Sequence, residues 1–305
     1  MANNDNLLAL TPETNSYYVN YPRDFVPYGT ISNVDKFESF EFAYDMSYGK
    51  KGAHRAHRSG GSNVRAMGEI FINAFQGKLA EYALYRYYEK KNIYMKKPDT
   101  SVFKLGQWDS FDLECQGKHI SVKSTKSYGN LLLLETADWN DEGEYKPNKE
   151  SGASKYDYTV LVRFKPDGED LMKQNKLLYQ KDEEIPEDIK DILIEKIRNV
   201  NWTYDFPGFI FYTELVKMIR DKQILPKEAM LNGSTKMDAE NYYYQTGKMH
   251  PLSDSFTLTE RTETEHSSDL FERECPECGK KLHQKNSSFI EYWECDCGYK
   301  EPIEL

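Results

Sequence analysis

Two neighbouring segments, residues 111–115 (FDLEC) and 119–126 (HISVKSTK), bring acidic and basic side chains close together in the sequence. Because side chains alternate between the two faces of a strand, Asp112 and Glu114 share one face of the first segment. Lys123 falls on the same face of the second segment if the two strands pair. Carboxylates and an ammonium group on one face can bind a hydrated divalent cation and activate a water molecule.

The short connection between these segments predicts a hairpin. A two-residue turn whose first central residue is Gly117 suits a type II′ turn, which requires glycine there. With this turn, Asp112 lies opposite Lys123 and Glu114 lies opposite Ser121. The apolar side chains point to the other face, and they are Phe111, Leu113, Cys115, Ile120 and Val122.

An exposed hairpin with an ordinary cross-strand ion pair is the alternative, since such a pair contributes only about 0.2 to 1 kcal/mol and is common. The preceding residues 63–92 weigh against it, because they have a strong helical period. The buried stripe of this helix consists of Phe71, Phe75, Leu79 and Tyr82. Glu81 lies at the edge of the stripe, so a helix glutamate precedes the aspartate and lysine of the two strands.

This order of residues resembles the PD-(D/E)XK nuclease superfamily, which includes most type II restriction endonucleases, Mrr-like enzymes and archaeal Holliday-junction resolvases. The matching residues are GKLAE at 77–81, the aspartate of FDLEC, and SVK at 121–123 followed by STK. The resemblance covers residues 64–126, and a strand at 157–164 would continue it.

The resemblance implies a role for each matching residue. Glu81 would be the helix acid, Asp112 the metal-binding acid and Lys123 the catalytic lysine. The second carboxylate of the family belongs at position 121, where this chain has serine, and Glu114 would supply the missing oxygen from across the hairpin. Mg²⁺ binds through one or two carboxylates plus water and phosphate oxygens, so Asp112 with Glu81 or Glu114 would suffice. Lys123 would orient the attacking water and offset the charge of the phosphate.

Four cysteines near the end of the chain have the spacing of a zinc ribbon. Cys275 and Cys278 form a CxxC pair, and after sixteen residues Cys295 and Cys297 form a CxC pair. Four thiolates complete a tetrahedral structural zinc site. Two disulfides are the alternative, but no signal peptide opens the chain, so we expect reduced thiols, bound zinc and a cytoplasmic location. The fifth cysteine, Cys115, is expected to be a small core residue.

The net charge of −10 argues at first sight against a nucleic-acid partner. However, residues 50–68 are rich in glycine and serine and contain basic residues but no acid. Such a stretch before a helix suits phosphate contacts, although a solvated linker has the same composition. The residues predicted to contact DNA are Lys50, Lys51, Arg55, Arg58, Arg65 and Lys126.

The remaining pattern predicts an α/β fold, in which a mixed central β-sheet is flanked by helices as in a restriction-endonuclease-like core. Residues 157–166 predict a buried strand, and residues 208–212 a short strand that leads into a helix at 213–221. A further helical stripe consists of Ile189, Leu193 and Ile197. Three tyrosines at 242–244 could stack on bases, but half-buried sheet positions are the favoured interpretation. No apolar run approaches the length of a membrane span.

These features divide the chain into four parts. Residues 1–62 form an N-terminal arm with the basic loop and no clear period, and residues 63–251 form the nuclease-like core with its recognition elements. Residues 252–270 are a linker, and residues 271–305 are the small C-terminal zinc ribbon.

The resemblance implies a Mg²⁺-dependent endonuclease of the type II restriction class, which cuts double-stranded DNA to leave 5′-phosphates. Such enzymes usually act as homodimers, often beside a DNA methyltransferase encoded nearby. Nuclease activity on RNA is left open, because the motif does not distinguish the two sugars. Two further alternatives remain open. One is a repair or junction-resolving nuclease of the same fold. The other is a non-catalytic nucleic-acid-binding protein whose zinc ribbon binds and whose nuclease-like core has decayed, as Ser121 would permit.

Overall fold

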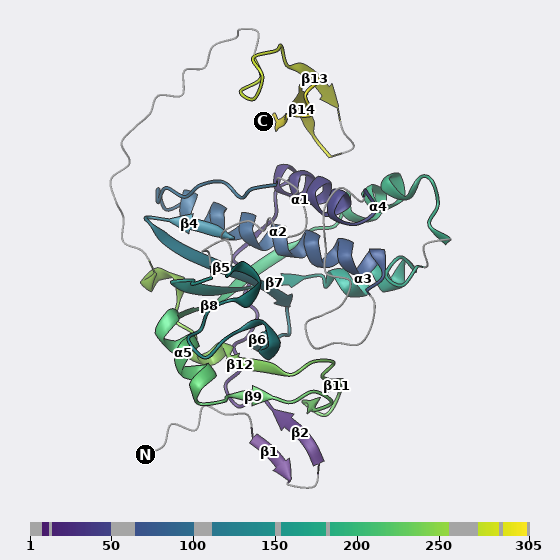
Figure 1. Cartoon of the computed structure of the whole chain (residues 1–305). Helices are drawn as coiled ribbons and strands as arrows, with labels where there is room; N and C mark the ends of the chain where they lie inside the picture. The colour runs from purple at the N-terminus through teal and green to yellow at the C-terminus, as the bar shows by residue number, and fades with distance from the viewer. Residues whose placement is uncertain are drawn as a thin grey trace.

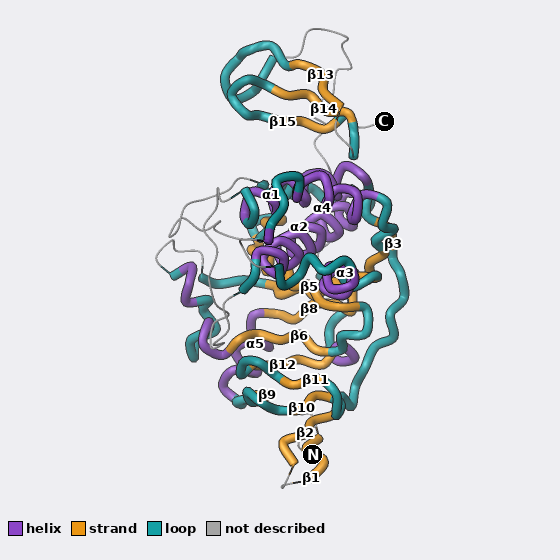
Figure 2. Tube along the Cα trace, turned by 90° about the vertical axis from the view of Figure 1, so that its right-hand side faces the viewer, coloured by secondary structure: helices purple, strands orange, loops and turns teal. Residues whose placement is uncertain are grey.

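A five-stranded mixed sheet forms the centre of the computed structural model, with the strand order β3-β8-β7-β5-β4. Figure 1 labels β4, β5, β7 and β8, and Figure 2 labels β3. Strands β5 and β7 are parallel, and the other neighbours in this sheet are antiparallel. The bounds are β3 Gly29–Thr30, β4 Leu113–Cys115, β5 Lys118–Lys126, β7 Tyr158–Lys165 and β8 Thr203–Phe211. The predicted buried strand at 157–166 is thus confirmed as β7.

The structure describes residues 8–11, 14–49, 65–100, 112–149, 154–180, 184–255, 274–286 and 289–303. Within these ranges the fold is mixed α/β, with several sheets and five α-helices. The predicted fold class, a mixed sheet with flanking helices, is therefore present in these ranges. None of the described helices is both long enough and apolar enough to span a membrane.

Four helices lie together on one side of the central sheet, as Figure 2 shows for α1, α2 and α4. Their bounds are α1 Asn33–Met46, α2 Met67–Glu89, α3 Gly168–Gln174 and α4 Ile189–Arg198. The predicted stripe of α2 is fully buried, and it packs with Ile120 and Val122 of β5. The predicted stripe of α4 is also buried. Helical period therefore identified both helices correctly.

A second layer covers the other face of the central sheet. It contains α5 Tyr212–Arg220 and a three-stranded sheet in the order β6-β12-β9. The bounds of these strands are β6 Leu131–Glu135, β9 Ile224–Leu225 and β12 Asn241–Gln245. Tyr243 is buried in β12 and pairs with Leu133, whereas Tyr242 and Tyr244 are half-buried. The favoured interpretation of the three tyrosines as sheet residues is confirmed.

Two smaller sheets lie at the ends of the molecule (Figure 2). One has the order β1-β2-β10-β11, with bounds Leu8–Thr11, Thr14–Tyr18, Met230–Leu231 and Thr235–Lys236. The other belongs to the ribbon, with β13 His283–Asn286, β14 Glu291–Glu294 and β15 Lys300–Pro302.

The first 49 residues, which have no clear period in the sequence, contain regular elements that pack on the core. Strand β3 adds to the central sheet, and α1 packs on α2 with Phe37 and Phe40 buried. The helical period was obscured because α1 also buries polar side chains. One of these, Asp35, pairs with Arg86 of α2 at 3.0 Å, and another, Lys36, donates to the carbonyl of Arg198 at 2.8 Å. Polar residues on the buried face reduce the difference in hydrophobicity between the two faces of the helix, and the helical period depends on that difference.

A buried ion pair joins β7 to β8. Arg163 is 0% exposed, and its Nε and Nη2 donate to the two carboxylate oxygens of Asp205 at 2.8 and 2.5 Å. Its remaining donors reach the carbonyls of Arg23 and Asp24 at 2.7 and 2.8 Å, and Asp205 also accepts from the backbone N–H of Val26 at 3.1 Å. The pair therefore fixes an N-terminal segment against the central sheet.

We expect Arg163→Ala to lower the free energy of unfolding by about 3 to 5 kcal/mol, because it leaves the Asp205 carboxylate buried without its cation. Urea denaturation followed by circular dichroism measures this loss. Lys217→Ala is the matched control, since Lys217 forms an exposed pair with Asp221 at 2.7 Å. The control should lose only about 0.3 to 0.5 kcal/mol. Equal losses in the two variants would mean that the buried pair contributes no more to the free energy of unfolding than the exposed pair.

Candidate functional site

The hairpin of β4 and β5 exists, but its register differs from the predicted one. Leu113 pairs with Ile120 and Cys115 with Lys118, so the turn consists of Gln116 and Gly117. Both turn residues have positive φ, 51° and 72°, as a type I′ turn requires. The predicted turn placed glycine first, whereas the structure uses Gln116 in that position.

This correction changes which residues face one another across the hairpin. Glu114 lies opposite His119 instead of Ser121, and the same register continues to place Asp112 across from Ser121 instead of Lys123. The shift is by two residues, and side chains alternate with a period of two. Asp112, Ser121 and Lys123 therefore keep the common face that the sequence predicted.

Asp112 is held at the end of β4 by β5. Its Oδ2 accepts the backbone N–H of Val122 at 2.7 Å and the hydroxyl of Ser121 at 3.2 Å. The carboxylate thus continues the ladder of hydrogen bonds at the N-terminal end of β4. Its other oxygen, Oδ1, has no hydrogen-bond or ion-pair partner in the described part of the chain, and the side chain is 31% exposed. This oxygen can accept a ligand or a metal ion.

Lys123 completes the group on this face. Its Nζ lies 3.9 Å from Asp112 Oδ2, and the side chain is 35% exposed. The Nζ also lies 6.0 Å from the ring centroid of Tyr145, which belongs to the loop that follows β6. A long contact to the carboxylate leaves the ammonium hydrogens available for another anion. The arrangement can therefore bind a phosphate beside a carboxylate.

The two glutamates are not brought into this group. Glu114 is exposed, and α2, which carries Glu81, packs on the opposite face of the sheet. Glu81 accepts from Lys78 at 2.7 Å, and Lys78 also donates to the carbonyl of Asp99 at 2.6 Å. Among the described residues, the three carboxylates of Asp112, Glu81 and Glu114 do not form a cluster of metal-ligand size.

Most of the predicted DNA contacts lie outside the described residues, namely Lys50, Lys51, Arg55 and Arg58. Arg65 is half-buried just before α2. Lys126 points to the same face as Val122, and its Nζ lies 2.8 Å from Asp167 and 3.4 Å from Glu169. Burial lowers the pKa of Lys126, but the two carboxylates outweigh burial and hold the pKa above its ordinary value. The charge of Lys126 is thus balanced by Asp167 and Glu169. Lys126 does not belong to the group formed by Asp112 and Lys123.

The four ribbon cysteines meet as predicted. All four sulfur atoms of Cys275, Cys278, Cys295 and Cys297 lie within 4.8 Å of one another. The Cys275–Cys297 and Cys278–Cys295 distances are 3.5 and 3.4 Å, far longer than the roughly 2.05 Å of a disulfide. A tetrahedral zinc ion with bonds of about 2.3 Å needs sulfurs at similar separations. The cluster can therefore hold a metal ion such as zinc.

The ribbon also packs on the helical layer. Phe289 is buried against Phe40 and Phe37 of α1, with ring centroids 5.2 and 6.2 Å apart, and Tyr292 lies 5.3 Å from Phe37. Lys300 adds an ion pair with Glu41 at 3.5 Å. These contacts attach the ribbon to the helical layer through α1.

Two groups of residues carried no local sequence signal. Tyr145 is one, since nothing in its surroundings predicted a contact with Lys123. The other is a cluster in which Glu214 accepts from Tyr244 at 2.9 Å and lies 3.0 Å from His250. These three residues come from α5, β12 and the segment after it. Only the tertiary structure brings them together.

No family model, no curated protein and no solved structure matches this chain.

A thiol titration tests the metal centre and the fifth cysteine together. We expect one zinc ion per chain, released as an organomercurial reagent titrates the four ribbon thiols. Cys115 should stay unmodified at pH 7.5, because burial raises the pKa of its thiol to about 11. A chromogenic chelator measures the zinc, and a sample in guanidinium chloride should show all five thiols. Five reactive thiols in the native protein, or protein purified without metal, would contradict the assignment.

Proposed function

We propose that this chain is a metal-dependent DNA endonuclease of the PD-(D/E)XK type, and more specifically a type II restriction enzyme that leaves 5′-phosphates. The proposal rests on the Asp112 carboxylate and the Lys123 ammonium, 3.9 Å apart on one open face of adjacent antiparallel strands. The second support is that the order of these residues in the sequence resembles that superfamily. A homodimer and a companion methyltransferase belong to the same proposal.

The proposed chemistry uses the two oxygens of Asp112 differently. Oδ2 is fixed by Val122 and Ser121, so the carboxylate presents Oδ1 outward. Oδ1 would hold Mg²⁺, with the remaining positions filled by water and phosphate oxygens. When bound, the ion would neutralise charge on the phosphate and lower the pKa of the attacking water.

Lys123 would act on the phosphate and the water. Its ammonium hydrogen-bonds a phosphate oxygen and offsets the negative charge that develops during attack. The ring of Tyr145, with its centroid 6.0 Å from the ammonium, lies at the outer limit of a cation–π contact on one side of Lys123. A lysine in such a position can also orient the water for in-line attack.

We expect Lys123→Ala to reduce cleavage of plasmid DNA by at least about a hundredfold, because it removes the group that binds the phosphate and orients the water. Asp112→Asn should abolish Mg²⁺-dependent cleavage while retaining the fold, since the amide oxygen still accepts from Val122. Gel electrophoresis with Mg²⁺ or Mn²⁺ measures cleavage, and thermal unfolding checks the fold.

Lys118→Ala is the matched control for this series. Lys118 lies on the same strand as Lys123 and also pairs with an aspartate, Asp157, at 2.9 Å, but at the far end of the strand. Its removal should leave cleavage unchanged. Full activity of both Asp112→Asn and Lys123→Ala would end the proposal. A four-way junction tested beside plasmid separates restriction from the alternative of a junction-resolving or repair nuclease.

One observation favours a second candidate, a nucleic-acid-binding protein without catalysis. Ser121 occupies the position of the missing carboxylate, is fully buried and bonds to Asp112. Glu114 was expected to replace the missing carboxylate from the position opposite Ser121. It lies opposite His119 instead. In this alternative the zinc ribbon binds the nucleic acid, and the hairpin site is a remnant.

Ser121→Asp distinguishes the two candidates. The new carboxylate would lie across the hairpin from Asp112, so we expect Mg²⁺ to bind more tightly, with a gain of at least about tenfold for a second anionic ligand. Isothermal titration with Mg²⁺ measures this, and Ser121→Asn is the uncharged control. Cleavage that appears only in Ser121→Asp would favour the decayed site. Wild-type cleavage that depends on Asp112 would favour the endonuclease.

A further inference from the structure

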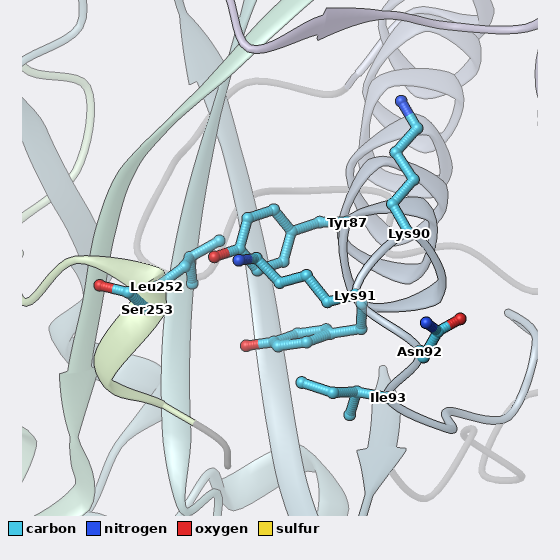
Figure 3. A pocket seen from close by; sticks show the side chains of 8 residues that line it. Tyr87, Lys90, Lys91, Asn92, Ile93, Leu252 and Ser253 are labelled. Atoms are coloured by element: carbon cyan, nitrogen blue, oxygen red, sulfur yellow. The ribbon is translucent and has the colours of Figure 1, made fainter. Parts of the chain in front are cut away.

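Four lysines lie close together in the sequence where α2 ends. Residues 90–97 (KKNIYMKK) contain Lys90, Lys91, Lys96 and Lys97 and no acid, in a chain whose net charge is −10. All four are exposed, and Figure 3 shows Lys90 and Lys91 leaving the end of α2 in different directions. Lysines at the C-terminal end of a helix offset its dipole. This accounts for the first two lysines but not for the residues that follow.

Three of the four charges have no acidic partner in the part of the chain that the structure describes. Lys97 pairs with Glu38 at 2.8 Å, whereas the other three lysines form no ion pair with a described residue. Glu89 precedes them, but it pairs with Arg86 at 2.8 Å. Unpaired cations on one segment produce a local positive potential even in an acidic protein. Such a surface attracts phosphate groups.

An exposed tyrosine lies among these lysines. Exposure alternates along residues 93–96, because Ile93 and Met95 are buried while Tyr94 and Lys96 face outward. Tyr94 is 71% exposed, and no aromatic ring of the described residues packs on its ring. The ring is therefore open to a base, on which an aromatic side chain can stack.

The backbone that carries Tyr94 is anchored on both sides. Its carbonyl accepts from the Sγ of Cys115 at 3.4 Å, and the N–H of Ile93 donates to the carbonyl of Tyr88 at 3.0 Å. Ile93 and Met95 belong to the core on the helical side of the sheet. Cys115 lies on β4, the edge strand of the central sheet. The tyrosine and its lysines are thus held at the outer edge of the hairpin, on its helical side.

We propose that residues 90–96 bind a single-stranded segment of nucleic acid, with a base stacked on Tyr94 and phosphates at the three unpaired lysines. Exposed aromatic rings among cations are typical of surfaces that bind single strands. In a duplex the faces of the bases are covered by their neighbours, so Tyr94 would have no base to stack on. Asp112 and Lys123 face the other side of the sheet, and the proposal does not rest on the endonuclease assignment.

Fluorescence anisotropy of a labelled single strand of twelve thymidines tests the proposal with the full chain, and the duplex with its complement is measured beside it. No Mg²⁺ is added, so the outcome does not depend on whether the chain cleaves DNA. We expect the single strand to bind, with a slope of log affinity against log salt of at least about −2 in size, since three phosphate contacts contribute about 0.7 each. No binding of the single strand, or a slope of zero, would overturn the proposal.

Tyr94→Ala should weaken binding of the single strand by about tenfold, because it removes the stacking ring, whereas Tyr94→Phe should bind as the wild type does. Tyr179→Ala is the matched control, since Tyr179 is 61% exposed and follows α3. It should change the affinity by less than about twofold. Duplex affinity should be unchanged in Tyr94→Ala. Equal effects of the two alanine variants, or an equal loss of duplex binding in Tyr94→Ala, would contradict stacking on an unpaired base.

Lys96→Met and Lys97→Met form a second matched pair of variants. The two lysines are adjacent and exposed, but only Lys97 is paired with an acid, Glu38. Lys96→Met should weaken binding of the single strand severalfold and reduce the size of the salt slope by about 0.7, the contribution of one phosphate contact. Lys97→Met should leave the slope unchanged. Equal changes of slope in the two variants would show that the unpaired lysines are not the phosphate contacts.

Discussion

The buried pair of Arg163 and Asp205 is the constraint on which the arrangement of layers depends. A guanidinium inside the protein needs all its donors satisfied, and here they reach β8, the segment around Arg23 and the start of β6 near Asn130. Arg163 sits on the same face of β7 as the residue paired with Lys123 on β5. The interaction therefore sets the second layer against the central sheet. That layer includes the loop that brings Tyr145 to Lys123.

In the hairpin site, the same residues that hold the strands together are those of the proposed chemistry. Asp112 directly precedes β4 and accepts from Val122, so one carboxylate oxygen binds to the sheet and the other is left for a ligand. Because a backbone hydrogen bond orients the carboxylate, little entropy is lost when a ligand binds to the free oxygen. The ammonium of Lys123 is held less closely. A fixed anion beside a movable cation is an arrangement that can adapt to phosphates of slightly different position.

Periodicity was sufficient for the parts of the fold that have one clear buried face. The stripes of α2 and α4 and the apolar run of β7 gave correct elements, and alternation placed Asp112 and Lys123 on one face. The register was missed because both Gln116-Gly117 and Gly117-Lys118 are acceptable two-residue turns, and tertiary context selects between them. Helix α1 was missed because its inner face carries Asp35 and Lys36. Tyr145 and His250 are brought to their partners only by long-range contacts.

A metal ion at the four thiolates would stabilise the ribbon, and the ribbon packs on the helical layer. With three short strands and a small core of Leu282 and two cysteines, the ribbon has too little apolar surface to fold alone without the thiolate site. Once folded, it places Phe289 over Phe40 and Phe37, which α1 would otherwise expose. Helix α1 in turn packs on α2 through the Asp35–Arg86 pair. A metal ion bound at the ribbon would therefore also stabilise the packing of the helices that cover the central sheet, and the contacts of Phe289 give the ribbon a structural role.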